Sequence, residues 1–253
     1  MVPLRDRNPT RRTAWVTLAL IVINVAVFAF AQQAGSTSDH QTELIYERAA
    51  IPCEILHQRP ITFSELRTDT CDDTVGRRTT TPFPDKQVDL AILVSLFLHA
   101  SWLHLGGNML FLWIFGNNVE DALGPLRYLA FYVMAGLVAT LAQLALDPGS
   151  TAPLIGASGA IAGVMGAYLV WFPRARILTW LSFLLIVVTY VPAWLVLGFW
   201  FVSQFFTAES SGVAWMAHVG GFAFGALVAA QLRNTEWFRR RLAAALPHGF
   251  VSF

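Results

Sequence analysis

Six long apolar runs constrain this 253-residue chain more than any other feature. A helix needs about 20 mostly apolar residues to cross the ~30 Å hydrocarbon core of a bilayer. Only 13% of the residues are charged, against roughly 25% in soluble domains, so lipid must surround most of the chain. We therefore predict an all-α polytopic membrane protein with six transmembrane helices. The segments that are long enough lie at approximately 14–31, 91–115, 128–146, 155–172, 177–206 and 214–232.

Two of these segments allow more than one interpretation. The first follows four arginines and contains an A-x-A pattern at 29–31, as secretory signals do, but it exceeds the usual 7–15 residues of a signal core. We expect it to remain as an uncleaved span. The fifth holds about 30 residues, too few for two spans and a turn. We expect one span there, preceded by an interfacial stretch, with Pro192 at a kink or at the boundary between the two.

The arginines predict the orientation of the spans. With the amino terminus inside, eleven arginines fall in the cytoplasm, and the short outer loops near 147–154 and 207–213 contain no lysine or arginine. Basic residues next to spans mark the cytoplasmic side. We expect both termini inside: a basic cytoplasmic segment at 1–13, a six-span domain at 14–232 and a cytoplasmic tail at 233–253.

A long polar segment, 32–90, separates the first two spans and is expected to form an extracytoplasmic loop. It holds both cysteines, Cys53 and Cys71. On an oxidising side of the membrane they would form a disulfide. Two free buried thiols are the alternative, because the sequence does not show whether the two residues approach each other. Neither cysteine has a C-x-x-C or histidine-rich setting, so we expect no metal site.

A small set of polar residues interrupts the apolar runs. Intramembrane polar residues are costly, and each is a hypothesis for a functional site. In the predicted topology the second, fourth and sixth spans run in one direction, so all these residues lie in the outer halves of their spans. His104 and Asn108 are four residues apart and face the same way, whereas His99 and His104 point roughly 140° apart and make a poor metal-binding pair. The set is His99, His104, Asn108, Ser158 and His218.

Small residues surround the serine and the last histidine. Gly159 and Gly163 form one small-xxx-small pair, and Gly221 and Gly225 form another. Such pairs let helix backbones approach closely. Close approach is what a serine–histidine hydrogen bond of about 2.6–3.2 Å between two helices requires.

These residues resemble the motifs of the rhomboid family of intramembrane serine proteases. A lone G-x-S-G is weak, but the motifs together, in this order and each at the outer end of a span, are specific. The resemblance covers roughly 92–232. It rests on His99-Ala-Ser-Trp-Leu-His104-Leu-Gly-Gly-Asn108-Met109, Glu120-Asp121-Ala-Leu-Gly124, Gly156-Ala-Ser158-Gly159 and Ala217-His218-Val-Gly220-Gly221.

The resemblance implies a role for each of the four residues. Ser158 would be the nucleophile, and His218 would be the base that later protonates the leaving amine. No acidic third member lies in the spans, so helix packing would orient the imidazole of a dyad. His104 and Asn108 would be oxyanion donors, joined by the backbone N–H of Ser158. No cofactor is implied, and the substrates would be membrane proteins with a single, helix-destabilised span, cut near the outer membrane face.

Two departures from the family pattern stand out. Many rhomboids have an aromatic residue one turn after the serine, where it packs on the catalytic histidine, but this chain has Ala162 there. Another side chain must then support the ring, or the ring is less constrained. The Trp-Arg pair common in the first outer loop is also missing, since no tryptophan occurs between 32 and 101.

Two other function classes remain open. One is a catalytically inactive rhomboid-like protein that acts in binding or quality control. The retention of Ser158, His218, His104 and Asn108 argues against this class. The other is a transporter or channel, which would usually show intramembrane charges or inverted repeats. A net charge of +1 gives no sign of nucleic-acid binding. The lack of an organelle-targeting segment favours the cytoplasmic membrane of a bacterium. The expected partners are the lipid bilayer and the membrane-protein substrates.

Overall fold

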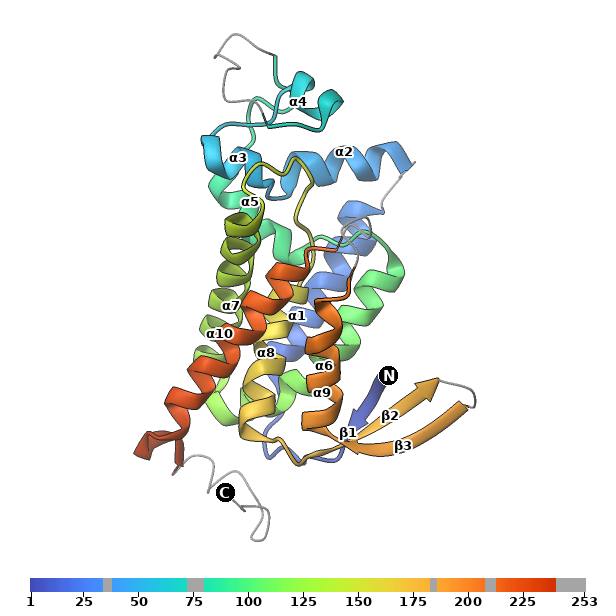
Figure 1. Cartoon of the computed structure of the whole chain (residues 1–253), viewed down its shortest axis with the longest axis vertical. Helices are drawn as coiled ribbons and strands as arrows, with labels where there is room; N and C mark the ends of the chain where they lie inside the picture. Colours follow the sequence, from blue (N-terminus) through green and yellow to red (C-terminus); the bar gives the residue numbers. More distant parts are fainter. Residues whose placement is uncertain (34–37, 72–79, 183–185, 208–212, 240–253) are drawn as a thin grey trace.

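Helices form most of the computed structural model, which describes residues 1–33, 38–71, 80–182, 186–207 and 213–239. The longer helices run side by side along the long axis of the molecule (Figure 1). They are α1 (Trp15–Ala26), continued by the π-helical segment η1 (Val27–Gln32), α6 (Trp102–Leu123), α7 (Pro125–Leu146), α8 (Ser158–Trp171), α9 (Ala193–Gln204) and α10 (Trp215–Arg233).

Several of these helices are able to cross a membrane. Three are long and apolar enough by themselves: Trp15–Gln32, Pro125–Leu146 and Trp215–Arg233. A fourth candidate is the pair Val88–Phe97 and Trp102–Leu123, whose two halves are bent by 78°. α8 and α9 are apolar but hold only 14 and 12 residues. Within the described ranges, the structure thus supports a multi-pass membrane protein with three such spans, or four with the bent pair.

The predicted second span, 91–115, is broken in the structure. α5 (Val88–Val94) and the 3-10 helix η2 (Ser95–Phe97) end before an extended stretch, and α6 begins only at Trp102. His99 therefore precedes α6 and does not lie on it. The prediction that His99 and His104 point roughly 140° apart on one helix is wrong for this reason.

Polar side chains cause the break. The Gln32 side chain bonds both backbone groups of His99, because its Nε2 donates to the carbonyl and its Oε1 accepts from the N–H, each at 2.9 Å. Ser101 then caps α6, since its hydroxyl accepts from the backbone N–H of His104 at 3.1 Å. Serine is a preferred residue at this position. Hydropathy along the sequence shows one continuous apolar run. It does not show that side chains of Gln32 and Ser101 bond the backbone groups that a continuous helix would pair.

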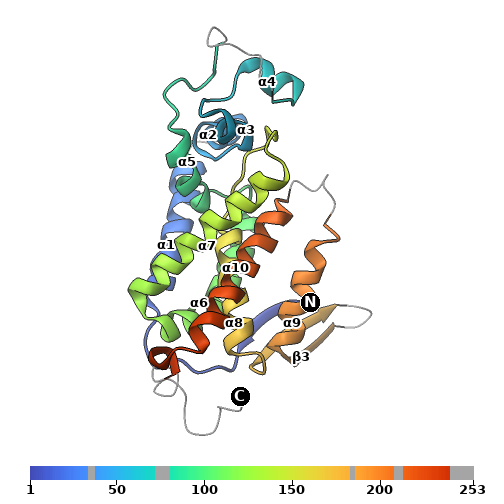
Figure 2. The same cartoon turned by 60° about the vertical axis from the view of Figure 1, so that its left-hand side comes forward.

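A three-stranded antiparallel sheet contradicts the predicted all-α fold. Its strands are β1 (Val2–Asp6), β2 (Arg176–Ser182) and β3 (Ile186–Pro192), in that order, at one end of the bundle (Figures 1 and 2). β2 and β3 occupy the stretch predicted to be interfacial, where β-branched and aromatic residues favour strands. Pro192 ends β3 directly before α9, so it marks a boundary and not a kink.

Asp6 fastens the sheet to two helices of the bundle. Its carboxylate accepts hydrogen bonds from Asn118 Nδ2 on α6, at 2.7 Å, and from the Tyr168 hydroxyl on α8, at 2.9 Å. Burial raises the pKa of Asp6 from 3.8 to about 6, although both hydrogen bonds act in the opposite direction. Folding therefore disfavours the ionised form of Asp6 relative to the unfolded chain.

Residues 38–71 cover the other end of the bundle with three short helices, α2 (Ser38–Arg48), α3 (Pro52–His57) and α4 (Phe63–Thr68). Ile51, Cys53 and Ile61 form a small buried cluster there, apart from the core of the bundle. Cys53 and Cys71 are joined by a disulfide with an S–S distance of 2.04 Å. Of the alternatives left open by the sequence, the structure thus has the bonded form.

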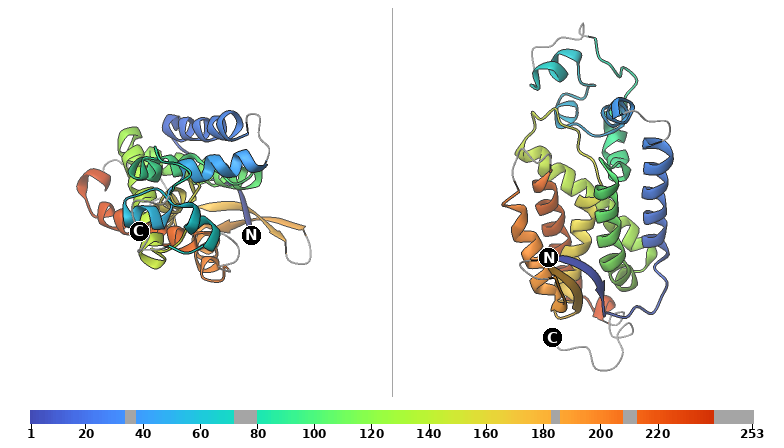
Figure 3. Two further views of the ribbon diagram at one scale, coloured as in Figure 1. Left: turned by 90° about the horizontal axis from the view of Figure 1, so that it is seen from above. Right: turned by 90° about the vertical axis from the view of Figure 1, so that its right-hand side faces the viewer.

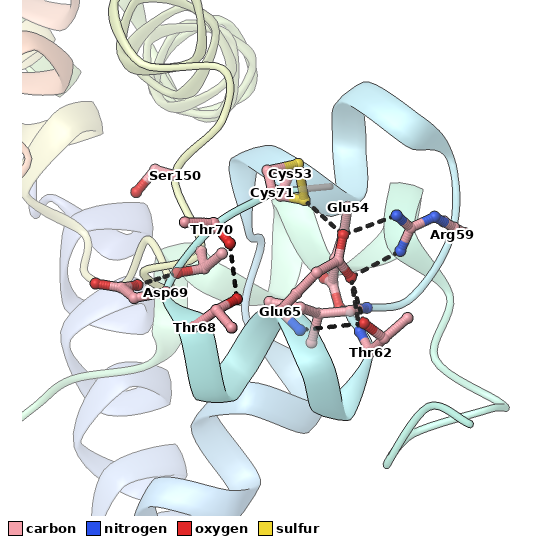
Figure 4. The surroundings of a disulfide bond; sticks show 12 residues. Cys53, Glu54, Arg59, Thr62, Glu65, Thr68, Asp69, Thr70, Cys71 and Ser150 are labelled. Atoms are coloured by element: carbon pink, nitrogen blue, oxygen red, sulfur yellow. Dashed lines mark hydrogen bonds and ion pairs between the residues drawn. A yellow bond between two sulfur atoms is a disulfide. The ribbon is translucent and has the colours of Figure 1, made fainter. Parts of the chain in front are cut away.

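One buried and one partly buried ion pair link residues of the segment 38–71, which we call the cap segment, to each other and to Lys86. Arg59 binds Glu65 with two hydrogen bonds of 2.8 and 2.7 Å, while Glu65 and Thr62 form a capping box at the start of α4 (Figure 4). The ammonium of Lys86 lies 2.6 Å from the carboxylate of Glu54, and both side chains are buried. Buried charges require such partners. The segment between the first two spans is thus an ordered cap and not an open loop over its described residues.

Glycines bring α8 and α10 into backbone contact. A Cβ atom added at Gly225 would lie 1.9 Å from the carbonyl oxygen of Gly163, and one at Gly221 would lie 2.1 Å from that of Gly159. A Cβ at Gly166 would meet the Phe222 carbonyl oxygen at 2.1 Å. These distances leave no room for any side chain, so the close approach expected from the small-xxx-small pairs is present.

Gly225→Ala should destabilise the bundle. The added methyl must push α8 and α10 apart, and overpacking of this kind costs at least about 1–3 kcal/mol of unfolding free energy. The matched control is Gly198→Ala on α9, where an added Cβ meets nothing within 4 Å. SDS titration followed by circular dichroism measures both variants. Equal stability of the two would contradict the packing described.

Asp6→Asn should stabilise the protein in a pH-dependent way. Because the pKa of Asp6 is higher in the folded state, the folded protein binds this proton more tightly than the unfolded chain does. The free energy of unfolding therefore falls as the pH rises from about 4 to 6. Asparagine mimics the protonated form. Thermal unfolding in detergent should therefore show a melting temperature for Asp6→Asn that exceeds wild type by more at pH 7.5 than at pH 4.5. A constant difference would disprove the effect.

Candidate active site

The four predicted site residues lie at or near the amino-terminal ends of three helices. His104 and Asn108 are in the first two turns of α6, Ser158 is the first residue of α8, and His218 is in the first turn of α10. These three helices begin in the half of the bundle nearer to α2–α4 (Figures 1 and 3). The structure thus places near one end of the bundle residues that are far apart in the chain, from His104 to His218.

The start of α8 lies inside the bundle. After α7 the chain descends through residues 147–157 in a non-helical conformation before α8 begins (Figure 3). Leu154 pairs with Ala50 of the cap segment, and the Gly156 N–H donates to the Ser95 carbonyl at 2.9 Å. Gly156 has φ +117°, a conformation that other L-residues rarely adopt. The turn at Gly156 thus precedes α8 and places Ser158 at its first position.

Ser158 and His218 are in direct contact. The serine Oγ lies 2.8 Å from Nε2 of the imidazole, within hydrogen-bond distance. The other ring nitrogen, Nδ1, lies 2.7 Å from Oε1 of Gln204, the last residue of α9. The histidine is thus held between a hydroxyl and a side-chain amide that come from two different helices.

The support of the His218 ring comes from α9. Ala162 is fully buried and has no ring to offer, and the Trp200 ring packs on His218 with 5.8 Å between centroids and 40° between planes. Sequence reasoning missed both Trp200 and Gln204. The sequence did contain one indication, because Gln204 is an amide near the end of an apolar run. Polar residues inside a membrane are candidates for functional residues.

His104 and Asn108 direct donors toward the backbone of Gly156. His104 Nδ1 accepts from the Ala100 N–H at 3.4 Å, so the proton of a neutral ring lies on Nε2. A Cβ on Gly156 would be 2.9 Å from that Nε2 and 3.5 Å from Asn108 Nδ2. The Asn108 Nδ2 is buried and has no hydrogen-bond partner among the described residues.

The start of α8 adds a third kind of donor. The first N–H groups of a helix have no acceptor within the helix, and the helix dipole favours negative charge at this end. The side-chain donors of His104 and Asn108 thus lie near the backbone of Gly156, two residues before Ser158, whose N–H is one of the first in α8. Such an arrangement can stabilise an oxyanion that forms when the hydroxyl attacks a carbonyl.

His99 does not belong to this constellation. Its ring is fully buried, with Phe28 edge-on at 6.5 Å and the His104 ring at 5.2 Å between centroids. Both its ring nitrogens lack a hydrogen-bond partner among the described residues. His99 thus packs behind His104 and helps to fix the break before α6.

The part of the chain that the structure describes has one group of potential metal ligands, namely Cys53, His57 and Cys71. The two cysteines are bonded to each other. A disulfide offers no thiolate, which is the form of cysteine that binds metals. This group therefore does not act as a metal site in the described state.

Comparison with known proteins identifies the family. The Rhomboid domain model matches residues 89–235, more than half of the chain. The chain is 31% identical over 173 residues to the mitochondrial Rhomboid protein 1 of Saccharomyces cerevisiae, and 34% identical over 159 residues to Rhomboid protease GluP of Bacillus subtilis. It is 34% identical over 88 residues to the mitochondrial presenilin-associated rhomboid-like protein of Bos taurus.

These matches cover 62%, 61% and 34% of this chain, but only 46%, 29% and 23% of the respective relatives. The chain thus spans less than half the length of the curated relatives it matches. The family model nevertheless includes every helix that carries a site residue. The resemblance read from the sequence motifs is confirmed, and the chain belongs to the rhomboid family.

Proposed function

We propose that this protein is an intramembrane serine endopeptidase that hydrolyses peptide bonds within the transmembrane segments of other membrane proteins. The observation that carries the proposal is the 2.8 Å contact between Ser158 Oγ and His218 Nε2 at the starts of two apolar helices. A nucleophile in hydrogen-bond reach of a base is the signature of covalent catalysis.

In the first half of the reaction, the Ser158 hydroxyl attacks the scissile carbonyl carbon while His218 Nε2 takes its proton. The carbonyl oxygen becomes an oxyanion and accepts hydrogen bonds from His104, Asn108 and the Ser158 N–H. The tetrahedral intermediate then collapses, the C–N bond breaks, and His218 gives its proton to the leaving amine. An ester between Ser158 and the amino-terminal part of the substrate remains.

In the second half, a water molecule attacks this ester while His218 takes one of its protons. Collapse of the second tetrahedral intermediate releases the carboxylic acid product, and the proton returns to the Ser158 hydroxyl. Each intermediate carries its charge at the same place, so one set of donors serves both steps. No cofactor is needed for this sequence.

We propose that six helices cross the membrane, with α8 and α9 as short spans. Helices of 14 and 12 residues are about 21 and 18 Å long, shorter than the ~30 Å hydrocarbon core, so local thinning of the bilayer or burial in the bundle must compensate. Residues 1–13 and 233–253 then lie in the cytoplasm and 32–90 outside. Their separation at opposite ends of the bundle, where described, supports this division.

The substrates are proposed to be membrane proteins with a single, helix-destabilised span. Ser158 begins α8 inside the bundle, so a peptide must be extended to place a carbonyl beside it, and a stable helix resists this. The named relatives include mitochondrial proteins and lend no support to the predicted bacterial membrane. The disulfide requires only that residues 38–71 face an oxidising compartment.

Cysteine labelling tests the topology. With the native disulfide intact, an added thiol in Ser150→Cys should react with an impermeant maleimide applied from outside. The thiol in Arg174→Cys should react only after the membrane is permeabilised, because residue 174 precedes the sheet at the proposed cytoplasmic end. Labelling of Arg174→Cys in intact cells would refute this orientation.

Substitution of the dyad tests the chemistry. Ser158→Ala and His218→Ala should each abolish cleavage of a helix-destabilised model substrate in liposomes, and the double variant should be no worse, because the two residues act as a unit. Asn108→Ala should retain a residual rate, with kcat lower by roughly 10²–10³-fold, since it removes one of several oxyanion donors. A fluorophosphonate probe should label wild type and miss Ser158→Ala.

The matched control is Ser64→Ala, which removes an exposed hydroxyl on α4 far from the site and should cleave as wild type does. Wild-type cleavage by folded Ser158→Ala would overturn the protease mechanism. In that case a binding or quality-control role without catalysis would be the better account of the family membership.

A further inference from the structure

We infer that Gln204 is a positioning residue that fixes which nitrogen of His218 carries the proton. The inference rests on the proposed function, because the tautomer matters only if His218 acts as a base. Gln204 is buried, with 7% of its surface exposed, and its Oε1 lies 2.7 Å from His218 Nδ1. It therefore stands on the side of the imidazole opposite to Ser158.

The orientation of the Gln204 amide follows from its other contacts. Its Nε2 lies 2.9 Å from the carbonyl oxygen of Trp200 and 3.2 Å from the Ser203 hydroxyl. A carbonyl can only accept, so the atom facing it must be the amide nitrogen. A flipped amide would set two acceptor oxygens against each other. Oε1 is thus the atom that faces the histidine.

An acceptor at this position determines the tautomer of the neutral ring. Oε1 has no hydrogen to donate, so Nδ1 of His218 must carry the proton and donate it. Nε2 is then left with its lone pair toward Ser158 Oγ at 2.8 Å, which is the form that can take the serine proton. The other tautomer would place a lone pair against Oε1 and a proton on the nitrogen that must act as the base.

A neutral amide suits this location. The sequences of α8, α9 and α10 contain no Asp or Glu. Burial of an ionised carboxylate in an apolar bundle is much costlier than burial of an amide whose hydrogen bonds are satisfied. Trp200 and Gln204 are four residues apart on α9, so the same face supplies the ring contact and the acceptor. The serine and histidine therefore work with a third, uncharged member.

Nuclear magnetic resonance of histidine-labelled protein tests the tautomer directly. Two-bond nitrogen–proton correlations of ¹⁵N-histidine distinguish a proton on Nδ1 from one on Nε2, and His218→Ala identifies the signal. Wild type should show the proton on Nδ1. Gln204→Leu removes the acceptor with little change in volume and should lose this preference. Gln204→Glu in its protonated form can donate to the Trp200 carbonyl and keep an acceptor oxygen toward His218, and it should restore the Nδ1–H form.

Kinetics supplies the second readout. Gln204→Leu should lower kcat by about 10- to 100-fold with KM within about threefold, less than the ~10⁴-fold loss in a triad whose base takes the wrong tautomer. Fluorophosphonate labelling should slow in proportion, and Gln204→Glu should recover part of the rate. Gln231→Leu makes the same change at an exposed position of α10 and should match wild type.

The outcomes separate the two proposals. A wild-type spectrum with the proton on Nε2 would overturn the role of Gln204, even if Gln204→Leu did not fold. So would a folded Gln204→Leu with wild-type kcat. Wild-type protein that neither cleaves nor reacts with the fluorophosphonate would instead overturn the proposed protease function, whatever the spectrum shows.

Discussion

The contact between α8 and α10 is the constraint on which the rest of the site depends. Gly163 and Gly225 let the two backbones touch, and a single added methyl group cannot fit between them. Only at this separation do Ser158 and His218, near the starts of the two helices, come within 2.8 Å. Inside a bilayer the hydrophobic effect does not favour contacts between helices over contacts with lipid. Close van der Waals packing must therefore set this distance.

The position of the candidate site residues at helix starts has two consequences. The first turn of a helix has free N–H groups, which the membrane interior cannot hydrate and which a developing oxyanion can use. The same position also allows the preceding chain to be irregular, so Gly156 can pass close to His104 and Asn108. α9 approaches from the side and presents Trp200 and Gln204 to the imidazole.

The sequence singled out the residues of the candidate site, but it did not show the whole fold around them. Ser158, His218, His104 and Asn108 stand out because a polar residue in an apolar run is rare, and spans of common direction place them at one level. The break at His99 and the pairing of β1 with β2 were missed, since their bonds join Gln32 or β1 to residues far along the chain. β2 and β3 pair locally, but their apolar residues were interpreted as an interfacial stretch before a span. Gln204 was missed because its partner depends on how α9 packs, which hydropathy does not report.

The cap segment (38–71) supports the chain that leads into the candidate site. The chain between α7 and α8 must enter the bundle without helical hydrogen bonds, and irregular backbone at membrane depth is tolerated only where protein supplies partners. The Ser95 carbonyl accepts from the N–H of Gly156. In the cap segment, Ala50 pairs with Leu154, and the Cys53 N–H donates to the Ser150 carbonyl. The disulfide at Cys53 therefore stabilises the surface against which the chain leading to Ser158 is held.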